Sequence, residues 1–258
     1  MMLDILNDIA DRVAEKVRPR WREACMGEEL EMGADGTPTL LIDRLAEEII
    51  IDHVKRSGLS WDILSEEAGR VGNGGDRTLV IDPIDGTYNA IMGIPFYSVS
   101  LALGRESLCD VDTAVVLNLV TGDRYTAIKG KGAWLNGCRI QTRKLDLKQA
   151  VFLVYMGHFA TDKDFRMARM GRRCRSLGCS SLELALVAQG SADGYYLHTD
   201  VYEKAIRVVD IAAAALILRE AGGDLVDLKG CRLDMPFDLS TRSNFLAYGD
   251  ESMREVLR

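Results

Sequence analysis

The sequence predicts an α+β protein built from two lobes. Helical periodicities and short apolar stretches typical of strands alternate along the 258 residues. In the first half, most strand candidates follow one another through tight turns, as antiparallel strands do. Because this pattern changes after about residue 142, we expect an N-terminal lobe over residues 1–142 and a C-terminal lobe over residues 143–258.

In the N-terminal half, two amphipathic helices precede the strands. Residues 3–25 carry apolar side chains at helical spacing with an interruption at Pro19, and a second helical pattern runs from Leu41 to Ser57. Glycine and proline crowd the segment between them, residues 27–39, which predicts a loop. Strands are expected at residues 61–65, 78–81, 96–104, 111–117 and 123–129, with a glycine-rich flap at 69–76 and tight turns at Thr121-Gly122 and Asn136-Gly137.

The C-terminal half alternates strands and helices more regularly. Its apolar stretches are short, and its last helical pattern is rich in alanine. The expected strands are 150–155, 174–177, 194–198, 224–227 and 244–248, and the expected helices are 162–172, 180–189 and 210–221.

The charge balance excludes some partners. The chain has 32 Lys and Arg against 39 Asp and Glu, a net charge of −7. It would therefore repel a nucleic-acid backbone, although metal ions would allow it to bind a small phosphorylated substrate. The apolar run at residues 211–218 is far shorter than the ~20 residues that span a bilayer, and the acidic N-terminus does not resemble a signal peptide. We expect a cytoplasmic protein without nucleic-acid or membrane partners.

Most residues that could bind a metal ion are carboxylates. The six cysteines are scattered without a CxxC pair, so we expect them to be reduced and structural. Histidines number only three. A metal site would therefore consist mainly of carboxylates, which favours a hard ion such as Mg²⁺, with Mn²⁺ as an alternative.

The sharpest motif is DPIDGT at residues 82–87. It follows a buried strand, whose hydrogen-bond ladder Pro83 is expected to end. Its two carboxylates, Asp82 and Asp85, repel each other if they point at one spot, and a divalent cation is the simplest way to offset that repulsion.

Two further acids are expected near this motif. Glu66 follows the preceding strand, and it lies beside Asp82 if the two strands are parallel neighbours. Asp210 begins an apolar helix, whose N-terminus favours an acid. Each feature alone also fits a structural role: Asp210 as a helix cap, Asp85-Gly86 as a turn and Glu66-Glu67 as solvated charge. Their combination at strand ends favours a metal site.

These motifs resemble those of the inositol monophosphatase family. DPIDGTYN at residues 82–89 is similar to the family's first signature, and VDIAAA at 209–214 with EAGG at 220–223 is similar to its second. NGCRI at 136–140 and RSLG at 175–178 match between them, in order. The segment GADGTPT at 33–39 and the continuation Tyr88-Asn89-Ala90 are similar to the archaeal branch, which often acts on both inositol phosphates and fructose 1,6-bisphosphate.

The resemblance implies a layered α-β-α-β-α sandwich of the sugar-phosphatase type. It also implies a homodimer and a Mg²⁺-dependent phosphomonoesterase, with inositol 1-phosphate and fructose 1,6-bisphosphate as expected substrates. The reaction would be direct attack of a metal-activated water on the phosphate, without a covalent intermediate.

The resemblance further implies roles for individual residues. The attacking water would be oriented and activated by Asp43, Thr87 and Glu66, and the Gly86 and Thr87 amides would bind the phosphate. Two or three Mg²⁺ ions would be held by six groups: Glu66, Asp82, the Ile84 carbonyl, Asp85, Asp210 and, for the third ion, Asp35.

The substrate side is expected in the C-terminal half. Gly178, Cys179 and Ser180 occupy the segment that contacts the sugar ring in relatives, where the cysteine departs from the more common Ser or Thr. Glu203 lies seven residues before Asp210, as an inositol-contacting acid does in animal relatives, and it also fits a solvated loop.

A local basic patch is a second substrate candidate. Arg166, Arg169 and Arg173 follow helical spacing, and Arg172 and Arg175 lie next to them. Arginine forks match phosphate oxygens, so this face, with Arg172 and Arg173, would receive a second phosphate. A solvated helix face or a subunit contact is the alternative interpretation.

Three other functions are alternatives to this prediction. Asp82 and Asp85-Gly86-Thr87 also resemble the nucleophile motif of the haloacid dehalogenase phosphatases, but that motif has one residue between its acids, whereas this chain has two. Related branches of the inositol monophosphatase family act on 3′-phosphoadenosine phosphates or NADP. An inactive metal-binding relative would normally lack an acidic ligand, and here all are present.

Overall fold

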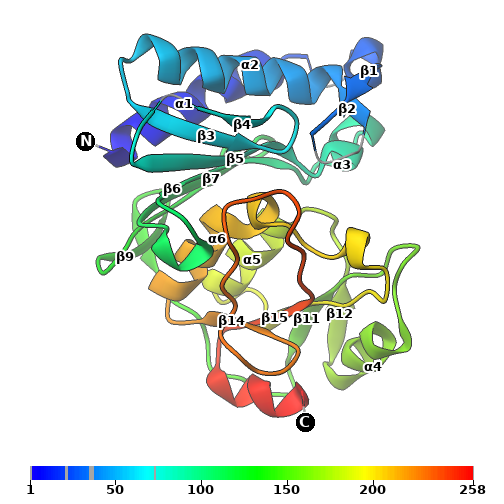
Figure 1. Ribbon diagram of the computed structural model, residues 1–258. Helices are drawn as coiled ribbons and strands as arrows, with labels where there is room; N and C mark the ends of the chain where they lie inside the picture. The colour runs from blue at the N-terminus through cyan, green and yellow to red at the C-terminus, as the bar shows by residue number, and fades with distance from the viewer. Residues whose placement is uncertain (1, 21–22, 35–37, 73, 258) are drawn as a thin grey trace.

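The computed structural model describes residues 2–20, 23–34, 38–72 and 74–257. Its elements stack in the order helix, sheet, helix, sheet, helix (Figure 1). This confirms the predicted α+β class and the layered α-β-α-β-α sandwich.

Two antiparallel-packed helices form the first layer. α1 (Met2–Val17) buries one apolar face that includes Leu6, Ile9 and Val13, and it packs on α2 (Leu41–Arg56). α1 ends at Val17, earlier than the predicted residue 25, because Pro19 cannot extend the helical hydrogen bonding.

The predicted loop over residues 27–39 is only partly a loop. After the short helix η1 (Ala24–Gly27), β1 (Glu29–Met32) and β2 (Pro38–Leu40) form an antiparallel pair. All residues of β1 are exposed, so this strand lacks the apolar alternation by which a strand is predicted.

The second layer is an eight-stranded sheet in the order β10-β9-β8-β7-β6-β5-β3-β4. Neighbouring strands are antiparallel except β3 and β5, which are parallel. Part of the predicted glycine-rich flap is therefore strand β4. The strands are β3 (Trp61–Ser65), β4 (Gly69–Val71), β5 (Arg77–Asp85), β6 (Ser98–Gly104), β7 (Thr113–Asn118), β8 (Arg124–Ile128), β9 (Gly132–Leu135) and β10 (Cys138–Ile140).

β5 corrects one prediction. The strand continues through Pro83 to Asp85, although proline was expected to end its ladder. The register with β6 shifts between Asp82 and Asp85, so Pro83 lies in a bulge where no backbone N–H is required. The short helix α3 (Thr87–Met92), which periodicity did not predict, follows directly.

The middle layer is α5 (Ser180–Ala188) and α6 (Val208–Glu220), with η2 (Leu108–Asp110) beside it. Every residue from Val208 to Leu218 is buried because α6 lies between the two sheets. α6 begins at Val208, two residues before the predicted start at Asp210. α6 contacts β5, β6 and β7, which belong to the other predicted lobe. The predicted division into two lobes at residue 142 stays a prediction.

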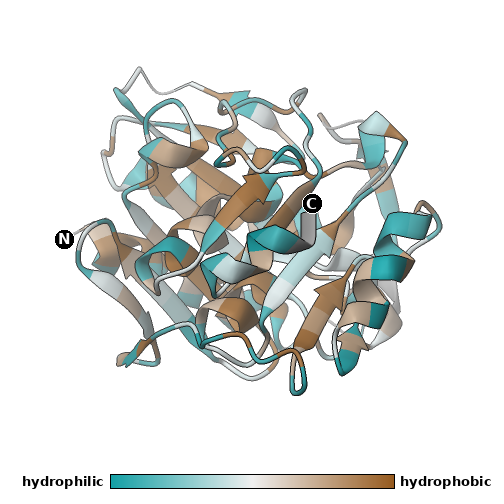
Figure 2. Cartoon of the chain, turned by 90° about the horizontal axis from the view of Figure 1, so that it is seen from below, coloured by the Kyte–Doolittle hydropathy of each residue, from teal (hydrophilic) through white to brown (hydrophobic). Residues whose placement is uncertain are grey.

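A five-stranded mixed sheet and its outer helices complete the fold. Its order is β12-β11-β13-β15-β14, and it is covered on the outside by α4 and η4. Figure 2 shows the hydrophobic residues concentrated on the interior elements. The remaining elements are β11 (Val151–Val154), α4 (Asp162–Met170), β12 (Arg173–Arg175), β13 (Gly194–Leu197), η3 (Tyr202–Lys204), β14 (Asp224–Asp227), β15 (Phe245–Tyr248) and η4 (Glu251–Leu257).

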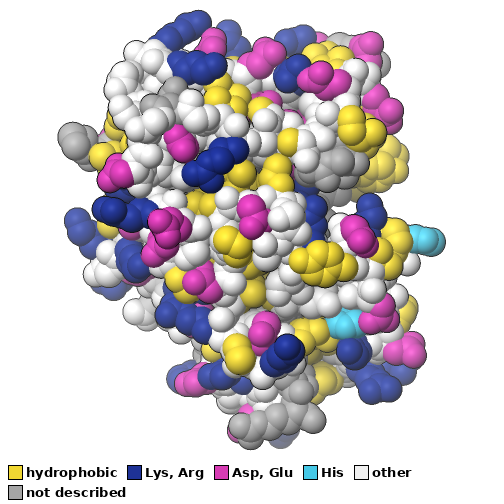
Figure 3. All heavy atoms as spheres, in the orientation of Figure 1, with side chains coloured by type: hydrophobic (Ala, Val, Ile, Leu, Met, Phe, Trp, Pro, Cys, Tyr) yellow, Lys and Arg dark blue, Asp and Glu magenta, His cyan; other side chains and the backbone are white. Residues whose placement is uncertain are grey.

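The surface agrees with the charge analysis. The face in Figure 3 carries interspersed positive and negative side chains rather than a field of one sign. Within the described ranges, every helix is too short or too polar to cross a bilayer. The described cysteines Cys109, Cys138, Cys174, Cys179 and Cys231 are free thiols.

Candidate active site

Three acids meet where the parallel pairing of β3 and β5 ends. Ser65 of β3 pairs with Ile81 of β5, so the next residues, Glu66 and Asp82, lie side by side. Asp210 reaches them from the first turn of α6. One carboxylate oxygen from each of the three residues lies within 4.8 Å of the others. We call Glu66, Asp82 and Asp210 the acidic cluster.

The acidic cluster has the character of a cation site. Burial, with the nearby carboxylates of Glu66, Asp85 and Asp210, raises the pKa of Asp82. The Oδ1 atom of Asp82 is buried, and no hydrogen-bond partner for it exists among the described residues. Leaving such an acceptor unsatisfied costs about 1–3 kcal/mol. Because hard divalent cations take oxygen ligands, these residues fit Mg²⁺ or Mn²⁺.

Asp85 faces the middle helix layer. Its carboxylate accepts hydrogen bonds from the Ser181 amide at 2.6 Å, the Ser180 amide at 3.2 Å and the Cys179 thiol at 3.2 Å. Burial raises the pKa of Asp85, and the hydrogen bonds from Ser181 oppose that rise. A carboxylate offers about four lone-pair sites, so three donors leave room for a cation.

Gly86 allows the chain to turn sharply from β5 into α3. Its φ is +86°, and a Cβ atom there would lie 3.1 Å from the Cys179 Cβ and 3.1 Å from the Phe96 carbonyl oxygen. Only glycine fits this left-handed, crowded position without strain. The turn places Thr87 at the start of α3, beside the carboxylates.

The buried Asp43 and the partly buried Thr87 form a pair next to Ile84. Thr87 Oγ1 lies 3.0 Å from Asp43 Oδ1 and 2.8 Å from the Ile84 carbonyl oxygen. Burial first, and the charge of Glu67 second, raise the pKa of Asp43 to about 8. A carboxyl group that titrates in this range is suited to exchange a proton near neutral pH.

The segment at residues 177–180 lies against this turn. Asn89 Nδ2 donates to the Phe96 carbonyl at 2.8 Å, to the Leu177 carbonyl at 2.7 Å and to the Gly178 carbonyl at 3.3 Å. Cys179 is buried, and Ser180 Oγ lies 3.1 Å from the Tyr195 hydroxyl. Cys179 and Ser180 donate to the Asp85 carboxylate, and the Gly178 carbonyl accepts from Asn89, while the substrate role of these three residues stays a prediction.

Sequence reasoning missed two charged residues of this region. Glu183 of α5 accepts the Leu177 amide at 3.0 Å, and burial raises its pKa to about 7. Arg207 contacts the acidic cluster directly, with Nη2 at 2.7 Å from Glu66 and 2.6 Å from Asp210. Its position three residues before Asp210, at a helix start, is the signal that a search for capping partners would have used.

Two other predicted residues are not tested by the described part of the structure or lie on its surface. Asp35 lies outside the described residues. Glu203 is exposed on η3. These positions leave the predicted roles of Asp35 and Glu203 as predictions.

The predicted arginine face is wrong as a single helix face. α4 ends at Met170 because Gly171 adopts an extended conformation, and Arg173 belongs to β12 instead. Arg172 and Arg173 are exposed, and Arg172 donates to the Gln149 side chain at 3.3 Å and the Lys148 carbonyl at 3.4 Å.

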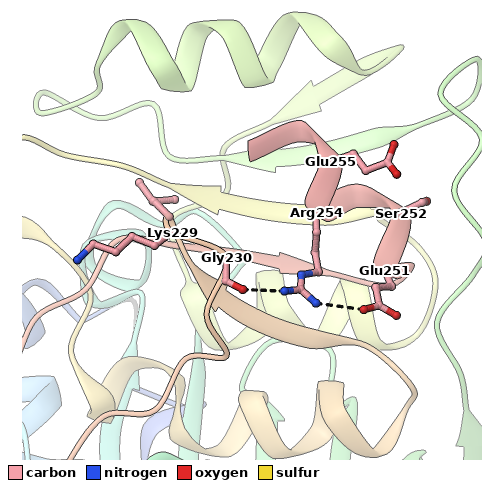
Figure 4. Close-up of a pocket in the computed structure, with 7 residues that line it drawn as sticks. Lys229, Gly230, Glu251, Ser252, Arg254 and Glu255 are labelled. Atoms are coloured by element: carbon pink, nitrogen blue, oxygen red, sulfur yellow. Dashed lines mark hydrogen bonds and ion pairs between the residues drawn. The ribbon is translucent and has the colours of Figure 1, made fainter. Parts of the chain in front are cut away.

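A separate surface hollow lies at the C-terminal end of the chain. It has a volume of about 530 Å³ and is lined by residues of η4 and the 228–230 turn (Figure 4). Arg254 points into it but donates to the Gly230 carbonyl at 2.7 Å and to Glu251 at 3.1 Å. None of the predicted site residues lines this hollow.

Comparison with known proteins places the chain in a family. The model of the inositol monophosphatase family matches residues 1–256. The chain is 37% identical over 265 residues to a fructose-1,6-bisphosphatase/inositol-1-monophosphatase of Methanothermobacter thermautotrophicus, covering 96% of this chain and 92% of the relative. It is also 35% identical to a bifunctional NADP phosphatase/NAD kinase of Methanococcus maripaludis, covering 93% of this chain but 46% of that protein.

A solved structure supports the same assignment. A Pyrococcus horikoshii protein, described as similar to inositol-1 monophosphatase, superposes with a TM-score of 0.85 at 32% identity and covers 98% of this chain and 95% of its own. The chain belongs to the inositol monophosphatase family. It is a phosphomonoesterase of this family, which is metal-dependent and typically acts on phosphorylated sugars and polyols.

Proposed function

We propose that this enzyme is a Mg²⁺-dependent phosphomonoesterase that hydrolyses inositol 1-phosphate, fructose 1,6-bisphosphate or both. The observation that carries this proposal is the acidic cluster beside the Asp85–Thr87 turn, in which the Asp82 Oδ1 atom has no hydrogen-bond partner among the described residues. The activities named for the Methanothermobacter relative support the same pair of substrates.

The metal ligands follow from the acids of the turn and the cluster. Asp82 would be a ligand of two ions, and a third ion would use Glu66 and Asp35. Bound ions would neutralise the phosphate oxygens and lower the pKa of a bound water. The first ion is assigned to Glu66, Asp82 and the Ile84 carbonyl, and the second to Asp82, Asp85 and Asp210.

Asp43 and Thr87 supply the proton path of the proposed reaction. The Thr87 hydroxyl orients the attacking water, whose proton passes through Thr87 to the Asp43 carboxylate. The water oxygen forms a new bond to phosphorus, the bond to the ester oxygen breaks, and the sugar or polyol leaves as an alcohol after taking up a proton. No side chain is phosphorylated in this scheme.

The substrate is placed by groups from both halves of the chain. The Gly86 and Thr87 amides would bind phosphate oxygens, and residues 178–180 with Glu203 would contact the sugar or polyol. Arg172 and Arg173 are exposed and free to approach a second phosphate, although they do not share a helix with Arg166 and Arg169.

NADP dephosphorylation is the second candidate. It is favoured by the similarity to the Methanococcus protein, whose name includes an NADP phosphatase.

We also propose that the protein forms a homodimer and that its two lobes divide at residue 142. Sedimentation equilibrium would test the dimer, and limited proteolysis would test the boundary.

The direct test is phosphate release from a substrate panel. The panel holds inositol 1-phosphate, fructose 1,6-bisphosphate, glucose 1-phosphate, 3′-phosphoadenosine 5′-phosphate and NADP, each with Mg²⁺ and with EDTA. Mg²⁺-dependent release from the first two substrates is expected. Preferential release from NADP would favour the second candidate.

Two variants tie the activity to the acidic cluster. Asp82→Asn and Asp210→Asn should abolish turnover while the protein stays folded, because each loses a metal ligand but relieves carboxylate repulsion. Asp227→Asn is a matched control, since Asp227 accepts turn amides at the end of β14 and is not a member of the acidic cluster. Normal turnover in both cluster variants would refute the mechanism.

A further inference from the structure

Arg207 places a permanent positive charge against two members of the acidic cluster. Its Nη2 lies 2.7 Å from Glu66 Oε1 and 2.6 Å from Asp210 Oδ1. Its Nε lies 3.1 Å from both oxygens of Asp210, and its backbone amide donates to Asp210 Oδ2 at 2.8 Å. A guanidinium group stays protonated in proteins, so this charge cannot be removed by titration.

One cation contacts two members of the acidic cluster directly. Glu66 and Asp210 are bridged by one guanidinium, whereas the third acid, Asp82, keeps an oxygen without a partner among the described residues. Only 16% of the Arg207 side chain is exposed, so solvent screens the charge poorly. The charge of Arg207 also favours the ionised form of Asp82, so the fold carries its own counter-ion for the acidic cluster.

The same charge acts on any divalent cation that the acids bind. Coulomb repulsion between the guanidinium and the ion opposes binding, and the ion must also compete for oxygens that Arg207 already engages. Arg207 therefore affects the metal-free and the metal-bound protein in opposite directions.

We propose that Arg207 is an internal counter-cation that stabilises the metal-free acidic cluster and weakens its affinity for the divalent ion. This inference rests on the proposed metal site. The ion can then exchange readily, because the positive charge of Arg207 offsets the repulsion among the carboxylates when the ion leaves. Arg207 is a positioning residue and takes no part in bond breaking.

The sign of its effect on metal affinity separates this role from simple orientation of Asp210. If Arg207 only held the Asp210 carboxylate in place, its removal would loosen a ligand and weaken metal binding. If Arg207 is a counter-cation, its removal strengthens metal binding and destabilises the metal-free protein.

The experiment measures Mn²⁺ binding to metal-stripped protein by titration calorimetry, and Tm in EDTA. Arg207→Gln should bind Mn²⁺ at least about tenfold more tightly, because a unit charge next to the ion is removed, and should melt lower in EDTA. Arg207→Lys keeps the charge and should stay within about threefold of the wild-type Kd.

Arg219→Gln is the matched control at the other end of α6. Arg219 pairs with Asp224 at 2.8 Å and is 9% exposed, so its loss should lower Tm but leave the Mn²⁺ Kd unchanged. If Arg207→Gln does not fold without metal, it is purified with Mg²⁺ and its Mn²⁺ Kd is determined by competition with a chelator.

The outcomes separate the two proposals. Mn²⁺ binding by wild type, with unchanged or weaker binding by Arg207→Gln, overturns the counter-cation role and leaves the proposed function standing. Equal, negligible Mn²⁺ binding by wild type and Asp210→Asn overturns the metal site and, with it, both proposals.

Discussion

The hydrogen bonds of Asn89 predict a measurable coupling between the metal side and the substrate side. The substitution is Asn89→Ala. Asn89 is buried at 8% exposure and joins α3 to the 177–178 segment through its side-chain amide. The substitution removes these bonds together with a bond to the Phe96 carbonyl.

The magnitude follows from the two short bonds. Asn89 Nδ2 donates to Phe96 at 2.8 Å and to Leu177 at 2.7 Å, and the 3.3 Å contact to Gly178 is weaker. Leaving two partly buried carbonyls without a donor costs about 2–4 kcal/mol in the free energy of unfolding. For a chain of this size, that lowers Tm by roughly 5–15 °C.

The assay combines urea unfolding with kcat/KM for phosphate release. We expect kcat/KM to fall at least about tenfold, since the 177–180 segment is no longer held against Asp85. Asn118→Ala is the control: Asn118 accepts two turn amides in the β7–β8 connection, so it should lose stability but keep kcat/KM within about threefold. If Asn89→Ala lowers the free energy of unfolding by less than about 0.5 kcal/mol, or if its kcat/KM equals that of the control, the reasoning is refuted.

Three further results are expected. Burial raises the pKa of Glu183 from 4.5 to about 7. The metal-free folded state therefore binds more protons than the unfolded state over this range. The free energy of unfolding of the wild-type protein should fall by up to roughly 3 kcal/mol as pH rises from about 4.5 to 7. Urea titrations should show this loss reduced in Glu183→Gln, and parallel pH profiles would contradict the assignment. A maleimide should label the exposed Cys138 and Cys231 in the native protein, but the buried Cys179 only after unfolding, as peptide mass spectrometry can show. Gly86→Ala should lower the free energy of unfolding by about 1–3 kcal/mol because of its left-handed φ, and a Tm equal to wild type would disprove the strain.

The sequence predicted the elements that bury an apolar face or stretch. α1, α2, β7 and β8 each carry such a pattern within their own residues, so no tertiary information is needed. β1 was missed because it is exposed throughout. α3 was missed because six residues are too few to show a helical period.

The candidate site was predictable to the extent that it depends on strand order. Glu66 and Asp82 meet because β3 and β5 are parallel neighbours, and Asp210 joins them from α6 as expected. The role of Arg207 was not predictable in this way, because its bridge to Glu66 depends on how α6 packs beneath the first sheet. The arginine face failed because Gly171 ends α4 before Arg173.

The contacts of Asp85 explain why the catalytic turn and the substrate segment form one unit. Its carboxylate is held by two amides and a thiol at the start of α5, where the helix dipole favours a negative charge. The same turn is tied back to Leu177 by Asn89. In the proposed reaction, a substrate bound at the 85–87 turn would therefore meet the 177–180 segment in a position that is already fixed. Such preorganisation would lower the entropy lost on binding.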